Sequence, residues 1–377
     1  MACRAPVAQN HPDPLDVFIA PISPSTPSSK AKRLLDRRIQ KDRSQSYRKS
    51  FQFAFLAFNL WLGARFFFWV RQLELHNGPH NLQRPAGVEG WLPIAGLMNL
   101  KYWMQSGHIP EVHPAALFLL ITFLAMSFLL RKAFCSWLCP IGTVSEYLWR
   151  LGKSLFGRNY LLPRWIDLPL RSLKYLLLTF FLWAISTMSP ESLQEFMQSP
   201  YGLIADVKML NFFRHIGETG LIVLGIFAVA SVIVKNFWCR FLCPYGAFLG
   251  LVSFFSPARI CRNSSTCIEC AKCAGACPSS LSVDKLVSIR SVECTGCLEC
   301  VAVCPSQSSL RLGMPVVGKA QSVAIPSWAA ATAIAVLFFG IVGFAKATGH
   351  WNSRISRETY EILVPKADQA AHPIPQR

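Results

Sequence analysis

The chain has 377 residues, of which 52% are hydrophobic and only 15% are charged. Soluble globular proteins carry about 25% charged residues, so this composition argues against a soluble fold and points to membrane-spanning segments. The formal net charge is +18, and the 14 cysteines fall mostly at metal-ligand spacings, which disfavours a scattered disulfide framework.

Residues 1–49 are predicted to form a disordered, basic N-terminal tail. Residues 1–29 are rich in Pro and Ser, and residues 30–49 contain nine Lys or Arg against two Asp. Such a segment lacks the apolar surface that a folded core requires. No apolar leader with a small-residue cleavage site is present, so export of the N-terminus is not expected.

Apolar segments predict about five transmembrane helices. They lie at 51–70, 115–130, 168–173 with 175–188, 219–234 and 325–345. The first has 20 residues, which at a rise of about 1.5 Å per residue crosses a hydrocarbon core of about 30 Å. The middle three are short, so we expect their helices to continue past terminal Lys and Arg residues that snorkel to the surface. Arg65, inside the first segment, is also expected to snorkel rather than contact a quinone headgroup.

Basic residues predict the orientation in the membrane. Segments 1–50, 131–174 and 235–319 contain 10, 8 and 9 Lys or Arg, whereas 71–113 and 190–218 contain 3 and 2. By the positive-inside rule, the first three segments face the cytoplasm and the C-terminal tail lies outside. Topology accounts for most of the charge. Nucleic-acid binding is not expected, because no basic and aromatic pattern of a known nucleic-acid module appears.

A short motif occurs twice. The sequence Phe-Cys-Ser-Trp-Leu-Cys-Pro-Ile-Gly at 134–142 is followed 104 residues later by Trp-Cys-Arg-Phe-Leu-Cys-Pro-Tyr-Gly at 238–246. Each copy comes directly after an apolar segment that enters the cytoplasm. An internal repeat of this kind places both motifs at one membrane face, where they can meet.

The repeat supplies four thiols, from Cys135, Cys139, Cys239 and Cys243. Cysteines four apart share one face of a helix, and the following Pro ends or turns that helix. The four sulfurs could hold an iron-sulfur cluster or a soft metal such as Cu(I) or Zn, or could act as a redox dithiol pair. The alternative is that these small residues only pack at an interface. Duplication of the motif favours redox or metal chemistry.

Two histidines precede the motifs by about one membrane thickness. His113 and His215 lie 22 and 24 residues before Cys135 and Cys239. A ligand pair at the outer face is one interpretation of this spacing. We favour the simpler one, that both histidines cap or solvate helix ends, because ligand histidines normally show a closer local signature.

Residues 267–305 contain the strongest motif in the chain. Cys267, Cys270, Cys273 and Cys277-Pro are followed by Cys294, Cys297, Cys300 and Cys304-Pro with the same spacing. In the bacterial two-cluster arrangement, the fourth cysteine of each run ligates the other cluster. The first [4Fe-4S] set is then Cys267, Cys270, Cys273 and Cys304, and the second is Cys294, Cys297, Cys300 and Cys277. Gly275 and Gly296 suit the tight turns between ligands.

The predicted protein is an α-helical polytopic membrane protein with an inserted cytoplasmic two-[4Fe-4S] ferredoxin module of small α+β fold. Its expected parts are the tail at 1–49, a four-helix membrane domain with both CxxxCP repeats at 50–256, the ferredoxin domain at 257–313, a fifth transmembrane helix at 325–345 and a C-terminal tail at 346–377.

With these motifs, residues 50–345 resemble the membrane-bound polyferredoxins related to NapH, to the C-terminal region of NosR and to CcoG. The resemblance implies that the eight ferredoxin cysteines hold two [4Fe-4S] clusters on the cytoplasmic side of a bacterial inner membrane. It also implies redox or copper chemistry at Cys135, Cys139, Cys239 and Cys243. Electron transfer linked to quinol and to periplasmic reductases, or a role in oxidase assembly, is the corresponding function.

Two functions are expected first, ahead of a redox sensor that carries no electron flow. The first is an electron-transfer component, rather than a stand-alone enzyme, that links a cytoplasmic or quinol donor to a membrane or periplasmic redox partner. The alternative is a copper-reducing or metal-handling assembly factor for a respiratory metalloenzyme. Two [4Fe-4S] clusters are expected in either case, and a third cluster or copper at the CxxxCP cysteines is left open. Membrane lipid and a quinone or redox protein are the expected partners.

Overall fold

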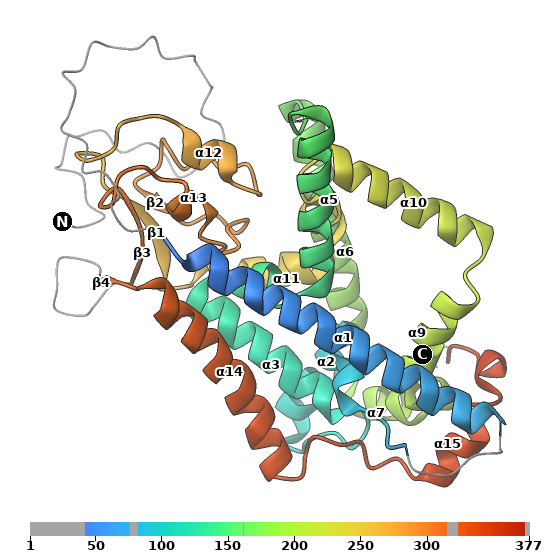
Figure 1. Cartoon of the computed structure of the whole chain (residues 1–377). Coiled ribbons are helices and arrows are strands. Elements are labelled where there is room, and N and C mark those ends of the chain that lie inside the picture. Colours follow the sequence, from blue (N-terminus) through green and yellow to red (C-terminus); the bar gives the residue numbers. More distant parts are fainter. Residues whose placement is uncertain (1–41, 76–81, 161, 315–322, 374–377) are drawn as a thin grey trace.

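The computed structural model describes residues 42–75, 82–160, 162–314 and 323–373. These residues form a helical bundle with a small strand-containing module at one end, called here the ferredoxin end (Figure 1). The helices of the first half are α1 (Ser44–Leu75), α2 (Pro93–Ser106), α3 (Pro114–Leu130), α4 (Ala133–Trp137), α5 (Pro140–Phe156) and α6 (Arg164–Ser186), with a 3-10 turn η2 (Ala86–Trp91) before α2.

In the second half of the chain, helices precede and follow the module in sequence. They are α7 (Pro190–Gln198), α8 (Pro200–Leu203), α9 (Ala205–Arg214), α10 (Glu218–Ile233), the π-helical turn η3 (Trp238–Leu242), α11 (Pro244–Phe254), α14 (Ser327–Ala347), α15 (Arg357–Leu363) and the 3-10 turn η4 (Ala367–Gln369). Helices α7, α9 and α15 lie at the far end of the bundle, away from the module (Figure 1).

Three of the described helices, α1, α6 and α14, are long and apolar enough to cross a membrane. Helices α9 and α10 together are long and apolar enough for a fourth span, but a bend of 85° separates them. Helix α3 is apolar but has only 17 residues. All five predicted apolar segments are thus helical, while the helices support three or four spans rather than the predicted five.

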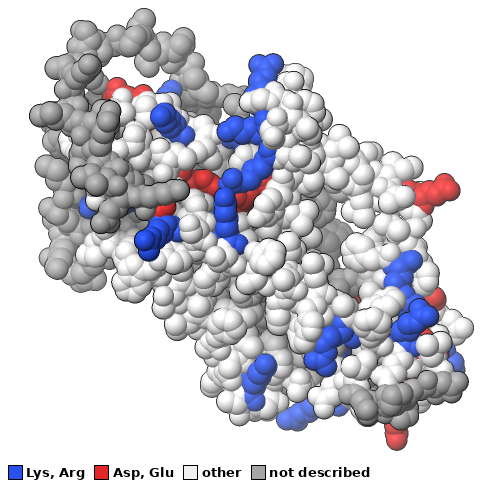
Figure 2. Space-filling view, viewed as in Figure 1, with Lys and Arg blue, Asp and Glu red and all other residues white. Residues whose placement is uncertain are grey.

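Helix α3 lies at the centre of the bundle, where it packs against α2, α11 and α14. Most of its side chains are buried inside the protein, including Leu117, Leu120 and Met126. By contrast, a broad uncharged surface separates the charged groups at the two ends of the molecule (Figure 2). This arrangement is typical of a membrane protein with an apolar belt.

The predicted snorkelling of the terminal Lys and Arg residues is wrong in most cases. Helix α6 does continue past its basic residues, but α3 ends at Leu130, because the next residue, Arg131, has a φ of 63° that no right-handed helix accommodates. The side chains of Arg131, Lys132 and Lys174 are buried in protein contacts, with relative exposures of 0%, 4% and 0%. The reason is that carboxylate and carbonyl groups of the ferredoxin module lie beside them.

The module itself consists of four short antiparallel strands and two short helices. The strands are β1 (Arg259–Arg262), β2 (Ser288–Ile289), β3 (Leu310–Met314) and β4 (Val323–Ala324), in the sheet order β2-β1-β3-β4. Ile260 pairs with Ile289 on one side and with Leu312 on the other. The helices are α12 (Lys272–Ala276) and α13 (Glu299–Ala302). The apolar core of the module is continuous with the buried side chains of α3 and α14, so it is built onto the bundle.

Helix α1 begins earlier than the sequence predicts. The tail was expected to be disordered to residue 49, yet α1 starts at Ser44, and Arg48 is 1% exposed. This first turn is ordered because Arg48 forms ion pairs with Glu146 of α5 and Glu299 of α13. The rest of the predicted tail, residues 1–41, lies outside the described residues.

Candidate metal and redox sites

The eight cysteines of the module line two separate cavities. One cavity is lined by Cys267, Cys270, Cys273 and Cys304, and the other by Cys277, Cys294, Cys297 and Cys300. Each group combines three cysteines of one run with the last cysteine of the other run, as the spacing predicts. Four thiols around one cavity are the donor set that a [4Fe-4S] cluster uses, so both groups fit this cofactor.

Equivalent left-handed residues shape the two ligand loops. Glu269 and Ala271 flank Cys270, with φ values of 56° and 54°, and Gly296 and Leu298 flank Cys297, with φ values of 63° and 59°. Non-glycine residues rarely adopt this conformation, and it persists where the surrounding structure enforces it at functional sites. Alternation of right- and left-handed residues forms a concave backbone whose successive amides can donate to a bound anion.

The two cavities differ in their access to solvent. Cys270 is exposed and Cys267 is half-buried, whereas all four cysteines of the second group are buried. Burial raises the pKa of Cys297 to about 12, so this thiol stays protonated at neutral pH unless a metal replaces the proton. The first cavity therefore faces the outside of the module, and the second faces the bundle.

The second cysteine of each CxxxCP motif caps a helix. Cys139 precedes α5 and Cys243 precedes α11, and each sulfur accepts a hydrogen bond from the glycine amide three residues on, at 3.5 and 3.2 Å. The Pro after each cysteine starts the new helix. Helix α4 ends at Trp137, before Cys139, so the two cysteines of the first motif do not share one helix as predicted. A helix N-terminus favours negative charge, which suits a ligating thiolate.

All four CxxxCP cysteines line one cavity of about 980 Å³. Phe134 and Trp238, the aromatic residues before the first cysteine of each motif, line it as well. The volume lies at the upper end of the range for cofactor and small-molecule sites, about 300–1,000 Å³. The two halves of the internal repeat therefore meet, as the sequence predicts, around a cavity large enough for a cofactor.

The same cavity extends along the bundle. At the ferredoxin end it reaches Cys297 of the second module group, and toward the far end it passes between α1 and α14 to Arg65 and Lys346. Arg65 lies over the ring of Trp61, with 5.2 Å between the guanidinium carbon and the ring centroid. The wall of the large cavity therefore extends from the predicted cluster ligand Cys297 to Arg65, toward the far end of the membrane domain.

Direct hydrogen bonds join the first motif to the loop of the second cavity. Ser136 Oγ donates to Thr295 O at 2.7 Å, and Trp137 Nε1 donates to Gly296 O at 3.2 Å. Ser136 and Trp137 stand between Cys135 and Cys139, while Thr295 and Gly296 stand between Cys294 and Cys297. The loops that carry the two sets of sulfurs are thus in contact.

The second motif contacts the other ligand segment of the same cavity. Arg240 Nη1 donates to Ser280 Oγ at 3.1 Å, three residues after Cys277. Lys235 Nζ donates to Gly275 O at 2.7 Å. Both copies of the repeat therefore hold the part of the module that carries the second group of cysteines.

Two buried charge networks, which the sequence analysis did not identify, fix this arrangement. In one, Arg48 binds Glu146 and Glu299, while Arg150 binds the same two carboxylates. Burial would raise the pKa of Glu146, but hydrogen bonding and the charge of Arg48 lower it below its ordinary value. The network connects α1, the helix after the first motif and the helix that carries Cys300.

The other network contains Lys132, Lys174 and Glu293. Glu293 Oε1 accepts from Lys174 Nζ, and Glu293 Oε2 lies 3.9 Å from Lys132 Nζ. Glu293 precedes the predicted ligand Cys294, and Lys132 lines the large cavity with the four CxxxCP cysteines. In the sequence, only the closeness of Lys132 and Glu293 to the cysteine motifs could have indicated this network.

The two histidines occupy different environments at the far end. His113 is fully buried at the start of α3, where its Nε2 lies 2.9 Å from Gly202 O and its Nδ1 lies 3.4 Å from Glu89 Oε1. His215 is exposed after α9. Both stand at helix ends, as the favoured interpretation states, and they do not form a pair.

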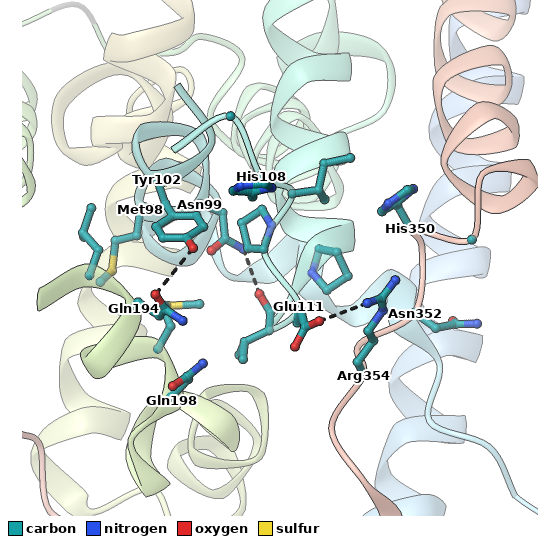
Figure 3. A pocket seen from close by; sticks show the side chains of 18 residues that line it. Met98, Asn99, Tyr102, His108, Glu111, Gln194, Gln198, His350, Asn352 and Arg354 are labelled. Carbon is teal, nitrogen blue, oxygen red and sulfur yellow. Dashed lines mark hydrogen bonds and ion pairs between the residues drawn. The ribbon is translucent and has the colours of Figure 1, made fainter. Parts of the chain in front are cut away.

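A second cavity of about 650 Å³ opens at the far end between α2, α7 and the residues after α14. Figure 3 shows Tyr102 directed at Gln194, and Glu111 paired with Arg354 at 3.0 Å. Gly349 and Asn352 line both this cavity and the larger one. The segment after α14 thus lies between the two cavities.

Within the described part of the chain, no three His, Cys, Asp or Glu side chains lie close enough together to hold one metal ion. A single ion needs every sulfur within about 2.3 Å of one point. A four-iron cluster instead distributes its thiolates over separate iron atoms.

Comparison with known proteins identifies two domains. Residues 112–159 and 216–260 match the family described as "4Fe-4S binding domain", and residues 259–306 match "4Fe-4S dicluster domain". The first match covers both CxxxCP motifs, and the second covers the eight-cysteine module. No solved structure matches the chain.

One named relative extends over most of the chain, and others match about half of it. "Putative electron transport protein YccM" of Escherichia coli is 46% identical over 87% of this chain and 92% of its own length. The methylamine utilization ferredoxin-type protein MauN of Paracoccus denitrificans is 30% identical over 50% of this chain and 63% of its own. The ferredoxin-type protein NapH of Escherichia coli is 25% identical over 46% of this chain and 57% of its own length. The chain therefore belongs to the membrane-associated polyferredoxin family that includes YccM.

Proposed function

We propose that this protein carries electrons through a membrane domain, between a cytoplasmic or quinol donor and a membrane or periplasmic redox partner. The observation that carries this proposal is the contact between Trp137 and Gly296, which joins the CxxxCP site to the loop of the second cysteine group. The printed descriptions of the relatives, an electron transport protein and ferredoxin-type proteins, support the same function. In this role the chain is an electron-transfer component rather than a stand-alone enzyme.

The proposed cluster ligands follow from the two small cavities. The first [4Fe-4S] cluster is assigned to Cys267, Cys270, Cys273 and Cys304, and the second to Cys277, Cys294, Cys297 and Cys300. When bound, such clusters accept and release single electrons. The chain positions their ligands on loops held by the strands β1 and β3, and it excludes water from the second group by burial.

The proposed order of the sites follows from exposure and contact. Cys270 is exposed, so the first site is open to a soluble partner of the module. The second site is buried and faces the CxxxCP motifs through Ser136 and Trp137. The long cavity then leads from the CxxxCP cysteines toward Arg65, between helices that face lipid. A lipid-soluble quinone, or a redox protein at the far end, is the proposed partner there.

We assign Cys135, Cys139, Cys239 and Cys243 to one shared redox site. Support comes from the common cavity and from the equivalent helix caps at Cys139 and Cys243. A third [4Fe-4S] cluster is the preferred occupant, because the family match that covers both CxxxCP motifs is described as a 4Fe-4S binding domain. In the proposed topology, the N-terminus and module face the cytoplasm, the C-terminus faces the periplasm, and α3 and α9–α10 complete five spans.

Metal analysis of the full-length protein tests this function. After anaerobic purification, two clusters give about eight iron atoms per chain and three give about twelve, with equal sulfide. Reduction by a quinol analogue should then change the low-temperature EPR spectrum. Zinc in place of iron, or only about four iron atoms per chain, would contradict the two-cluster assignment.

A copper-handling assembly factor is the second candidate. It is favoured by one observation, the four soft thiols that line a cavity large enough to admit a ligand. This function predicts one copper ion per chain and one-electron reduction of Cu(II) to Cu(I) by protein whose clusters have first been reduced chemically, with both lost when Cys139 is replaced by Ser. Iron at the same cysteines, with no bound copper, would exclude it.

A further inference from the structure

The internal repeat contains a lysine before each motif, and the two lysines have different environments. Lys132, three residues before Cys135, is 4% exposed and lines the large cavity with the four CxxxCP cysteines. Lys235, four residues before Cys239, binds Gly275 O and lies over the ring of Trp149, with Nζ 5.5 Å from its centroid. Of the two, Lys132 is therefore the one that places a positive charge at the site.

The carboxylate beside Lys132 does not balance this charge alone. Glu293 interacts with Lys132 at 3.9 Å and with the fully buried Lys174, so one carboxylate is shared by two ammonium groups. Asp167 is shared in the same way by Arg171 and Arg240, at 2.6 and 2.8 Å. The described ion pairs around the CxxxCP cysteines thus contain more cations than carboxylates.

A buried excess of cations is costly unless an anion lies nearby. Metal centres held by four thiolates are anionic, and each electron that they accept adds one further negative charge. In a medium of low dielectric constant, a fixed ammonium at short range stabilises the more negative state. The surplus charge therefore has a physical role if the centre lies in the cavity that Lys132 lines.

We propose that Lys132 sets the reduction potential of the centre held by Cys135, Cys139, Cys239 and Cys243, by stabilising its reduced state. The inference rests on the proposed function, because it requires a redox centre at these cysteines. The step that it influences is a one-electron transfer, in which the second cluster is oxidised and the CxxxCP centre is reduced. No bond forms or breaks.

The test is a redox titration, followed by EPR, of the full-length, anaerobically purified protein and three variants. The signal of the CxxxCP centre is identified as the one lost in Cys139→Ser. Lys132→Met should make reduction of that centre at least tenfold less favourable, a shift of about 59 mV for one electron. Lys132→Arg keeps the charge and should restore most of the potential. Lys235→Met is the matched control from the other half of the repeat and should leave it unchanged.

A potential that is unchanged in Lys132→Met, or shifted equally in Lys235→Met, would overturn the inference. If Lys132→Met does not fold, Glu293→Gln tests the proposal with the opposite sign, since removal of the shared carboxylate should raise the potential. A chain with about eight iron atoms and no signal lost in Cys139→Ser would overturn both the proposed shared site and this inference. A third centre with an unaffected potential would overturn the inference alone.

Discussion

Trp137 Nε1 donates a hydrogen bond to Gly296 O across 3.2 Å, and both residues lie in the middle of cysteine loops. Trp137 is 1% exposed, so this contact is sealed from solvent. It is one of two hydrogen bonds between the loop of the first CxxxCP motif and the Cys294–Cys297 loop. A change at this contact should affect communication between the two sites more than their occupancy.

Trp137→Phe should slow electron equilibration between the second cluster and the CxxxCP centre while leaving the iron content unchanged. The ring is retained, but Gly296 O loses its donor, which costs about 1–3 kcal/mol for a buried carbonyl. Rapid-mixing reduction followed by EPR measures the rate. Trp149→Phe is the matched control, because the buried Trp149 Nε1 has no hydrogen-bond partner to lose. Equal effects in both variants would contradict a role for the Trp137 bond.

Gly296→Ala should displace the module from the bundle. Gly296 has a φ of +63°, and an added Cβ would lie 2.9 Å from Leu130 O, which is backbone and cannot move aside easily. The expected result is loss of the second cluster, measured as iron content and EPR signal. Gly275→Ala is the control, since no atom lies within 4 Å of its added Cβ and its φ is not positive. Retention of both clusters in Gly296→Ala would show that the close approach is not required.

Arg48→Met should destabilise the docking of α1 against the module, because it removes the buried cation shared by Glu146 and Glu299 and leaves them only the partly exposed Arg150. Complete loss of a buried partner costs about 3–5 kcal/mol, so the cost here should lie below that range. Faster hydrogen exchange in α13 and in the first turn of α1 would report the change. Arg354→Met is a suitable comparison, because its ion pair with Glu111 is exposed at 65% and 63%. Exposed pairs contribute about 0–1 kcal/mol, so this variant should behave like the parent. Similar rates of hydrogen exchange in the two variants would contradict the proposed role of the Arg48 ion pairs.

A reporter fused after residue 377 should behave as periplasmic, and one inserted after residue 160 as cytoplasmic. The expectation rests on the 27 basic residues in the segments assigned to the inside, against five in the two outer loops. A cytoplasmic signal at residue 377 would mean that α14 does not complete a span. The orientation of the C-terminal segment would then have to be reversed.

Local spacing predicted the parts of the site that depend on nearby residues. The eight module cysteines gather in the two expected groups because each Cys-x-x-Cys loop is short and fixes its own geometry. The repeat predicted that the CxxxCP cysteines would share one cavity, since related halves meet symmetrically. Gly296 was identified as a turn residue, and its positive φ confirms this, whereas Gly275 has no such requirement.

Long-range pairing could not be predicted in this way. Arg48 and Glu299 are 251 residues apart in the chain, and no local pattern connects them. Lys174 and Glu293 are also far apart in the sequence. Their ion pair buries Lys174, which was expected to snorkel to the membrane surface. The burial of α3 inside the bundle could not be predicted either, because hydropathy does not distinguish an apolar helix covered by protein from one covered by lipid. Protein neighbours, rather than lipid, cover most of it.

The most direct test of the shared CxxxCP site is the metal content and EPR spectrum of four single variants, Cys135→Ser, Cys139→Ser, Cys239→Ser and Cys243→Ser. All four cysteines line one cavity, so each variant should lose the same centre. Iron should fall from about twelve to about eight atoms per chain in every case, with both ferredoxin clusters retained. If Cys135→Ser and Cys139→Ser kept the full metal content while Cys239→Ser and Cys243→Ser lost it, the cysteines would form two independent pairs, and the shared site would be contradicted.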